Sequence, residues 1–443
     1  MKKISAAVIA VMALTIGLSA QEKKREWKDR AEYDLYVAVT SAKTPADRLT
    51  DLDKWKSGYA QSDYADVRLQ AYLITYGQLN RAQDSVNTAQ EILKTDPNDF
   101  RALNAIIAAV YQLSALGAAP TPAGTAALDL GEKTSRYVLD NLDAIYAADK
   151  KPQGVADGDW AKAKNDEKLA AQRTLGYVYM QRKDNEKAAT ELTKSVQMDP
   201  TQAQVSYWLA GVLYAQAKAK PEVVPSALYS YARAAAYDGP GSLPAAGRAQ
   251  VETFLKRAYT TYHGSAAGLD QLEAQAKANA LPAGDIKIDS VVDIEKAKIA
   301  KEEEEKKADP MGALWKDLRT QLTGDNGQSY FDSGMKDADL PGGANGVTKF
   351  KGKIISMTPE NRPKEVVISI GDGTTPDATL KFDPALPGKM EPGETLEFNG
   401  TAKEFTKSPF MVIFEVDKDN LVGWTGKNAA PARKKAAPAT KKQ

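Results

Sequence analysis

Residues 169–200 read LAAQRTLGYVYMQRKDNEKAATELTKSVQMDP, and their spacing decides the fold. Small and large residues stand there at the offsets by which two antiparallel helices pack. The motif is Leu175-Gly176-x-x-Tyr179, then Ala188-x-x-x-Leu192-x-x-Ser195, then Pro200. The stretch carries no phosphate loop and no metal-ligand pattern. A helix pair of this kind builds a surface rather than a reaction site.

The same pattern occurs a second time, more weakly, in the segment that ends at Pro97. A first helix carries Tyr72 and Tyr76, and Tyr72 is as far from Pro97 as Leu175 is from Pro200. Two less regular units, interrupted by loop insertions, follow over residues 103–142 and 209–239. The sequence therefore predicts four helix pairs, because helical repeats tolerate insertions between their helices.

Apolar residues recur at the helical period from about residue 27 to residue 280, with no convincing alternating strand. A further helix is expected at 250–262, and the single histidine, His263, follows it directly before Gly264. A histidine and a glycine at that place suit a helix C-terminus. We interpret His263 as a capping or packing residue.

This pattern resembles the tetratricopeptide repeat (TPR), a helix-turn-helix unit of about 34 residues. Gln172 stands where the family pattern opens with a tryptophan. The resemblance implies an all-α right-handed superhelix of helix pairs; the alternative is a generic helical bundle. It assigns repeat packing to nine residues: Leu175, Gly176, Tyr179, Ala188, Leu192, Pro200, Tyr72, Tyr76 and Pro97.

The family resemblance also implies a groove for extended peptides or partner helices. In the best unit, the residues turned away from the packing face are Arg173, Tyr177, Met180 and Gln181. The next unit contributes Tyr207 and Tyr214. Tyrosine and arginine dominate the energy of many interfaces. Packing of these tyrosines between neighbouring repeats is the open alternative.

The first twenty residues, MKKISAAVIAVMALTIGLSA, have the pattern of a secretory signal peptide: two lysines, an apolar run, and small residues before Gln21. The apolar run is shorter than a membrane span needs, so no transmembrane segment is expected in the mature chain. We expect a periplasmic or secreted protein. Without a cysteine, the processed N-terminus has no site for a lipid anchor.

Composition argues against most enzyme chemistry. Of 443 residues, 43% are hydrophobic and 26% charged, and removal of residues 1–20 leaves 57 basic against 58 acidic side chains. There is no cysteine and one histidine, so thiol catalysis and multi-histidine metal sites are excluded. We predict no catalytic residues, no metal and no cofactor. The stretch VADGDW at 155–160 is interpreted as an inter-repeat loop.

The pattern changes to strands near residue 347. Five short runs with a two-residue period stand between turn-rich segments such as GDGTTPD at 371–377, which we interpret as a hairpin connection. Five strands over residues 347–425 predict a small β-barrel. It weakly resembles an oligonucleotide/oligosaccharide-binding (OB) barrel; an SH3-like barrel or a small sandwich is the alternative.

The predicted protein is thus multidomain: a signal peptide at 1–20, a TPR-like region at 26–280, a charged helical connector and linker at 281–346, the barrel at 347–425 and a disordered basic tail at 426–443. We expect a non-enzymatic scaffold that binds proteins or peptides. The alternative is an envelope binder whose barrel holds a polysaccharide, peptidoglycan or nucleic acid. A hydrolase with an unrecognised carboxylate pair is a third possibility. The tail could contact anionic envelope polymers, and no small-molecule substrate is inferred.

Overall fold

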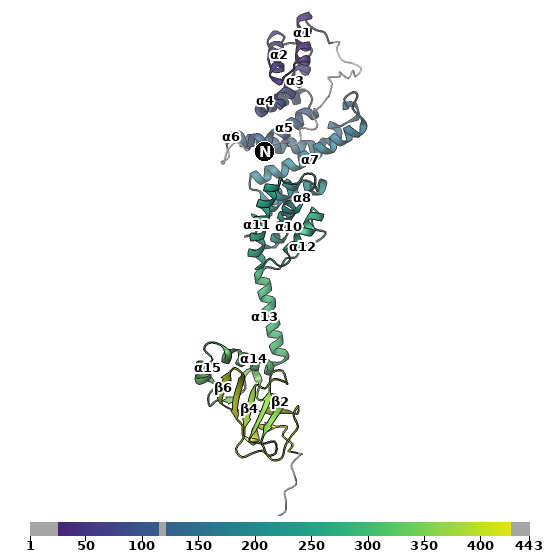
Figure 1. Ribbon diagram of the computed structural model, residues 1–443. Coiled ribbons are helices and arrows are strands. Elements are labelled where there is room, and N and C mark those ends of the chain that lie inside the picture. The colour runs from purple at the N-terminus through teal and green to yellow at the C-terminus, as the bar shows by residue number, and fades with distance from the viewer. Residues whose placement is uncertain (1–24, 115–120, 427–443) are drawn as a thin grey trace, which may run out of the picture. The chain divides into compact units, whose positions relative to one another are not determined.

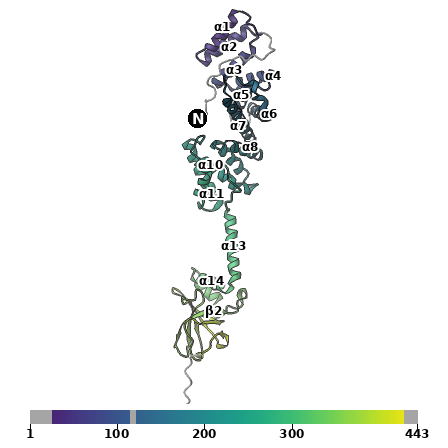
Figure 2. The same cartoon turned by 90° about the vertical axis from the view of Figure 1, so that its right-hand side faces the viewer.

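The computed structural model describes residues 25–114 and 121–426 (Figures 1 and 2). The chain divides into two compact units, Met1–Val291 and Val292–Gln443. The predicted signal peptide and all but the first residue of the predicted basic tail lie outside the described residues. Among those residues, no helix is both long and apolar enough to cross a bilayer.

The first unit is helical. Its α-helices are α1 Arg30–Ser41, α2 Pro45–Gly58, α3 Ala65–Gln78, α4 Ala82–Thr95, α5 Phe100–Ser114, α6 Pro122–Ile145, α7 Asp157–Gln181, α8 Asn185–Met198, α9 Ala203–Tyr214, α10 Val224–Ala236, α11 Ala245–His263 and α12 Leu269–Ala278. From α1 to α10, each helix packs on the next one along the chain, and α10 contacts both α11 and α12. The unit is therefore a TPR-like array of helix pairs, which confirms the predicted all-α repeat class.

Local sequence sets the ends of these helices. Asp184 precedes α8 and its side chain accepts a hydrogen bond from the Lys187 backbone N–H, as an N-cap residue does. Gly264 ends α11 in the left-handed conformation, with φ of 86°, which glycine adopts without steric cost. The Nδ1 atom of His263 lies 2.8 Å from the Asp289 carbonyl oxygen. The sole histidine thus lies at the end of a helix, as expected.

The array differs from the sequence prediction in two respects. The described residues extend the array beyond the four predicted helix pairs: α1 and α2 pack together before them, and α11 and α12 both pack on α10 after them. In addition, α7 begins at Asp157, so most of the predicted VADGDW loop is the first turn of a helix. Trp160 is buried there, and its Nε1–H donates to the Tyr146 carbonyl at 3.1 Å. The buried Trp160 thus belongs to the part of α7 that precedes the repeat motif.

The described residues of the second unit form three α-helices and eight strands. The helices are α13 Val291–Ala308, which starts at the unit boundary, α14 Pro310–Thr323 and α15 Gly327–Gly334. The strands are β1 Asp339–Leu340, β2 Phe350–Thr358, β3 Glu365–Ser369, β4 Ala378–Lys381, β5 Thr395–Phe398, β6 Gly400–Lys407, β7 Phe410–Glu415 and β8 Leu421–Val422. Helix α13 has no buried side chain.

The eight strands form one curled sheet in the order β1-β6-β7-β4-β3-β2-β5-β8. All pairs are antiparallel except β4 and β7, which are parallel. Only Asn399 separates β5, which pairs with β2, from β6, which pairs with β7. The sheet therefore curls back on itself through the segment 395–407 as a half-barrel, which confirms a small all-β curled sheet in this region; it has eight strands where the sequence predicted five.

Side chains from α14 and α15 complete the core of this unit. Trp315 and Leu322 of α14 and Phe331 of α15 are at most 2% exposed and pack with barrel residues such as Phe350 and Phe414. The sequence analysis predicted a connector over 281–346, but part of this segment is packed into the barrel core. Residues 310–335 belong to the barrel unit, because the apolar residues of α14 recur at three and four positions and cover the sheet.

Candidate functional site

The predicted packing residues of the best repeat lie between α7 and α8. Leu175, Gly176, Tyr179, Ala188 and Leu192 are all buried. A Cβ atom on Gly176 would lie 2.6 Å from Leu192 Cδ2 and 3.2 Å from the Leu192 backbone nitrogen. Gly176 of α7 therefore faces Leu192 of α8 at close range.

The other predicted packing residues lie in the first unit as well. The hydroxyl of the buried Tyr72 donates to Asp53 at 2.7 Å, and its ring stacks on that of half-buried Tyr76 at 5.5 Å. Pro97 and Pro200 are exposed residues of interhelix turns. The Pro200 carbonyl accepts a hydrogen bond of 2.7 Å from the buried Arg233, which fastens that turn.

Tyr179 takes part in an ion-pair network on the surface. Its hydroxyl donates to Glu132 Oε1 at 2.7 Å, and Arg136 donates to the same hydroxyl. Arg182 pairs with both Glu132 and Asp129. The Tyr179 hydrogen bond, together with these arginines, lowers the pKa of Glu132 to about 2. The network stabilises the contact between α6 and α7.

Half-buried and exposed aromatic side chains gather on two helices, α5 and α9, around buried aromatic side chains of α7 and α10. The Tyr177 ring lies 4.7 Å from that of Tyr111 and 5.4 Å from that of Trp208. Tyr207 and Tyr214 of α9 each approach Tyr231, with ring distances of 6.0 and 6.1 Å. We define the aromatic strip as the accessible members of these groups: Tyr111, Tyr207, Trp208 and Tyr214.

The structure separates the six predicted groove residues by depth. Tyr177 is only 8% exposed and lies beneath the strip, so it packs between repeats. Tyr207, in contrast, is 41% exposed. The remaining four are accessible to different degrees: Arg173, Met180 and Tyr214 are half-buried and Gln181 is exposed. The packing alternative therefore describes Tyr177, whereas Tyr207 is free to contact a partner.

Two members of the strip, Tyr111 and Trp208, were missed in the sequence. Arg173 lies close to the first of them: its guanidinium carbon is 5.9 Å from the Tyr111 ring centre, and it also donates to Gln202 at 2.7 Å. Tyr111 belongs to an irregular repeat without the motif residues, so its alignment with α7 was hidden. The structure shows the alignment, since three residues of α5 meet the residues 63 positions later in α7.

These three contacts form a seam of side-chain hydrogen bonds between α5 and α7. Asn104 Nδ2 donates to Glu167 Oε2 at 2.6 Å, the Tyr111 and Thr174 hydroxyls lie 2.8 Å apart, and those of Ser114 and Tyr177 lie 3.2 Å apart. The constant separation shows that the two helices run parallel and in register. Burial raises the pKa of Glu167 to about 7, against a smaller lowering effect of the Asn104 bond.

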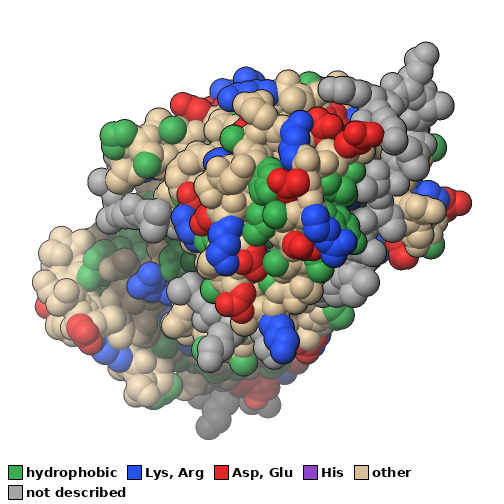
Figure 3. Space-filling view, turned by 90° about the horizontal axis from the view of Figure 1, so that it is seen from above, with side chains coloured by type: hydrophobic (Ala, Val, Ile, Leu, Met, Phe, Trp, Pro, Cys, Tyr) green, Lys and Arg blue, Asp and Glu red, His purple; other side chains and the backbone are tan. Residues whose placement is uncertain are grey.

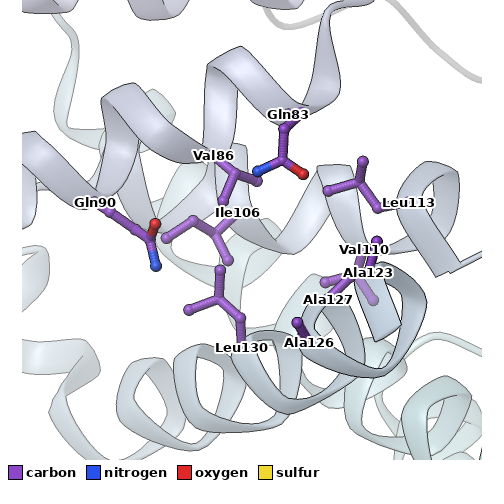
Figure 4. Close-up of a pocket in the computed structure, with 10 residues that line it drawn as sticks. All are labelled: Gln83, Val86, Gln90, Ile106, Val110, Leu113, Ala123, Ala126, Ala127 and Leu130. Atoms are coloured by element: carbon purple, nitrogen blue, oxygen red, sulfur yellow. The ribbon is translucent and has the colours of Figure 1, made fainter. Parts of the chain in front are cut away.

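An apolar pocket of about 190 Å³ lies elsewhere, between α4, α5 and α6 (Figure 4). The glutamines Gln83 and Gln90 of α4 supply its polar side chains, and its apolar lining consists of Val86, Ile106, Val110, Leu113, Ala123, Ala126, Ala127 and Leu130. The alanines of α6 leave this space because their side chains are short. Among the described residues that line the pocket, none carries a charged side chain.

The two aspartates of the loop between β3 and β4 accept hydrogen bonds from within the barrel unit. Asp377 is 2% exposed and accepts hydrogen bonds from Trp315 Nε1 at 2.9 Å and from the backbone of Ile370 and Gly371. Asp372 accepts the backbone N–H groups of Thr374 and Thr375. The GDGTTPD stretch connects the antiparallel strands β3 and β4, which confirms its interpretation as a hairpin connection.

Basic and acidic side chains are interspersed on the surface. On the face shown in Figure 3, lysine and arginine side chains lie among aspartate and glutamate side chains. Within residues 25–114 and 121–426, no three His, Cys, Asp or Glu side chains come together as a metal site would require.

No family model matches the sequence, and no curated protein is significantly similar to it. Among solved structures, the chain is similar to TTC0263, a thermophilic TPR protein of Thermus thermophilus. The two share 13% identity, the match covers 52% of this chain and 95% of that one, and the TM-score is 0.27. A TM-score this low does not establish a common fold. The fold assignment therefore rests on the helix packing described above.

Proposed function

We propose that the chain is an exported, non-enzymatic scaffold that holds a protein partner on the aromatic strip. The observation that carries this proposal is the exposure of Tyr207, at 41%, over a packed aromatic layer. A rigid tyrosine loses little side-chain entropy on binding, and large aromatic residues are the usual anchors of protein interfaces. Arg173 and Met180, both half-buried, would supply the neighbouring polar and apolar contacts.

Export is part of the proposal and rests on the first twenty residues alone. A protein with that leader would work in the periplasm or outside the cell. The lack of cysteine suits an oxidising compartment, since no unwanted disulfide can form. The proposed partner is a protein or peptide, and we assign the basic tail a solubilising role.

A substitution on the strip tests the binding proposal. Tyr207→Asp places a charge on the strip while removing little buried surface, so the fold should persist. Thr190→Asp, on the exposed side of α8, is the matched control. Quantitative capture from the envelope fraction with the mature chain as bait should lose its specific proteins with Tyr207→Asp and keep them with Thr190→Asp. Equal capture by both variants would remove the strip from the proposal.

A second candidate function is binding by the barrel. The ring β2-β3-β4-β7-β6/β5, with its parallel β4–β7 pair, has the strand order expected of an OB barrel, and we propose that type. OB barrels bind oligonucleotides and oligosaccharides on their strand face and loops. Titration of residues 309–426 with single-stranded DNA and with peptidoglycan fragments tests this candidate. It fails if neither ligand shifts any barrel resonance.

A further inference from the structure

The seam between α5 and α7 contains one carboxyl group without a charge partner. Glu167 is 2% exposed, its Oε2 atom accepts the Asn104 amide, and its Oε1 atom has no hydrogen-bond partner. Buried Trp160 and Ala171 lie on the same side of α7, two turns before and one turn after it. Such a site favours a neutral carboxylic acid over a carboxylate.

The groups that face Glu167 offer no compensation for a negative charge. Asn104 reaches it from α5 as a neutral amide, and Tyr146 lies near it from the end of α6. Asp166, the preceding residue, is also close to Tyr146 and carries the same sign of charge. No cation is among the described groups that act on the Glu167 carboxyl. Ionisation would therefore leave a nearly uncompensated charge between two packed helices.

We propose that the α5–α7 seam is a pH-responsive joint, closed while Glu167 is protonated and loosened when it ionises. A carboxylate at this depth gains hydration only if α5 and α7 separate enough to admit water. The other two bonds of the seam involve Tyr111 and Tyr177, so loosening disturbs the strip and the layer beneath it. The seam itself is independent of the proposed function; only its effect on partner binding rests on that proposal.

The direction of the effect follows from linkage. The pKa of Glu167 is higher in the folded protein, about 7, than its ordinary value of 4.5. Below both values the group is protonated in the folded and unfolded states alike and costs nothing. As pH rises between them, only the unfolded chain releases the proton, so stability falls until pH passes about 7. The joint is therefore closed in mild acid and weakened in mild alkali.

Glu167→Gln tests the proposal because glutamine keeps the shape and an acceptor for Asn104 but cannot ionise. Thermal unfolding and hydrogen exchange of the full mature chain should be compared at pH 5.5 and pH 8.0, after correction for intrinsic exchange rates. In the wild type, we expect the melting temperature of the helical unit to fall by several degrees on going to pH 8.0. Exchange protection of residues 100–114 and 160–177 should fall with it. Glu167→Gln should show neither change.

Two controls keep the outcome interpretable. Glu222→Gln removes an exposed carboxyl and should retain the wild-type pH profile. Amides of the barrel unit report any general effect of pH and should stay constant. If Glu167→Gln folds poorly, the wild-type protein alone still tests the proposal. Exchange protection of residues 100–114 is then compared with that of the barrel unit at the two pH values. Equal protection of α5 and α7 at both pH values, or the same pH profile in Glu167→Gln, overturns the proposal without touching the Tyr207→Asp test.

Discussion

Gly176 shows how closely a single position controls the helix pair. A methyl group there would overlap Leu192, whose backbone nitrogen is only 3.2 Å from the Cβ position. We predict that Gly176→Ala destabilises the helical unit by about 1–3 kcal/mol, because overpacking forces the helices apart. Gly211 of α9 is the control: its nearest neighbour would be 3.9 Å away, so Gly211→Ala should be neutral or slightly stabilising. Urea midpoints of the two variants measure the difference.

The two tyrosines Tyr177 and Tyr207 should respond differently to truncation. Tyr177 is buried under Tyr111 and Trp208, and its loss leaves a cavity, so Tyr177→Ala should cost about 3–5 kcal/mol. Tyr207→Ala removes a ring that is 41% exposed and in edge contact with Tyr231, and it should cost about 1 kcal/mol or less. Thermal melts of both variants check this order. Similar losses would mean that Tyr207 is also part of the repeat core.

Sequence spacing identified the direction of these residues but not their depth. The offsets of the motif correctly placed Leu175, Gly176 and Leu192 on the packing face. The same offsets predicted that Tyr177 faces the groove. Its burial there depends on Tyr111, which lies 66 positions earlier in the sequence. No local rule connects residues so far apart. The buried Glu167 escaped for the same reason, since its partner Asn104 lies in an irregular repeat.

At the scale of elements, α14 is the best example of a helix whose role depends on another part of the chain. Trp315 fills the barrel core and donates to the buried Asp377 at 2.9 Å. Trp315→Phe keeps an aromatic ring but removes the donor, so we predict a loss of about 1–3 kcal/mol for the barrel unit. Asp377 keeps its two backbone donors, so the unit should still fold. Denaturation monitored by circular dichroism measures the loss.

A matched pair of fragments tests the same boundary. Residues 309–426 include α14 and α15 and should fold alone with dispersed amide resonances. Residues 347–426, the extent of the predicted barrel, lack Trp315 and Phe331 and should not give a stable fold, because the core is left open. A well-folded 347–426 fragment would contradict the assignment of these helices to the barrel.

Strand β6 explains why the barrel was only partly predictable. The inward positions of its first half are Gly400 and Ala402, which are too small to show an alternating apolar pattern. A Cβ on Gly400 would lie 2.7 Å from Val416, so the strand must be poor in side chains where it packs closely. Strands β2 and β7, around Ile354 and Val412, carry large inward residues that give the alternating pattern. Helix α14 carried a helical period as well, but the charged residues before it suggested a linker.

At the scale of the whole molecule, the chain should be most sensitive to protease in α13. This helix has no buried side chain along its 18 residues, so local opening costs little packing. We predict that the first cuts by trypsin or Glu-specific protease fall within residues 291–308. The LPGGANG segment should resist, since Pro341 is buried and Leu340 pairs with Gly400. Mass spectrometry of early fragments distinguishes the two sites.

The leader makes a separate prediction. If residues 1–20 direct export, the native protein should begin at or near Gln21, as the small residues before it form a cleavage site. Intact-mass analysis of the protein purified from its own cells measures this. A soluble cytoplasmic pool that retains Met1 would contradict export and the proposed compartment together.

The central claim is that the aromatic strip holds a protein partner. Photocrosslinking from single positions in living cells tests it most directly. A photoreactive phenylalanine analogue at position 207 replaces the exposed Tyr207 with a ring of similar shape, and one at Thr190 on α8 serves as the control. The account predicts a discrete crosslinked adduct from position 207 and none from position 190. Identical adduct patterns from the two positions, or no adduct from position 207, would contradict it.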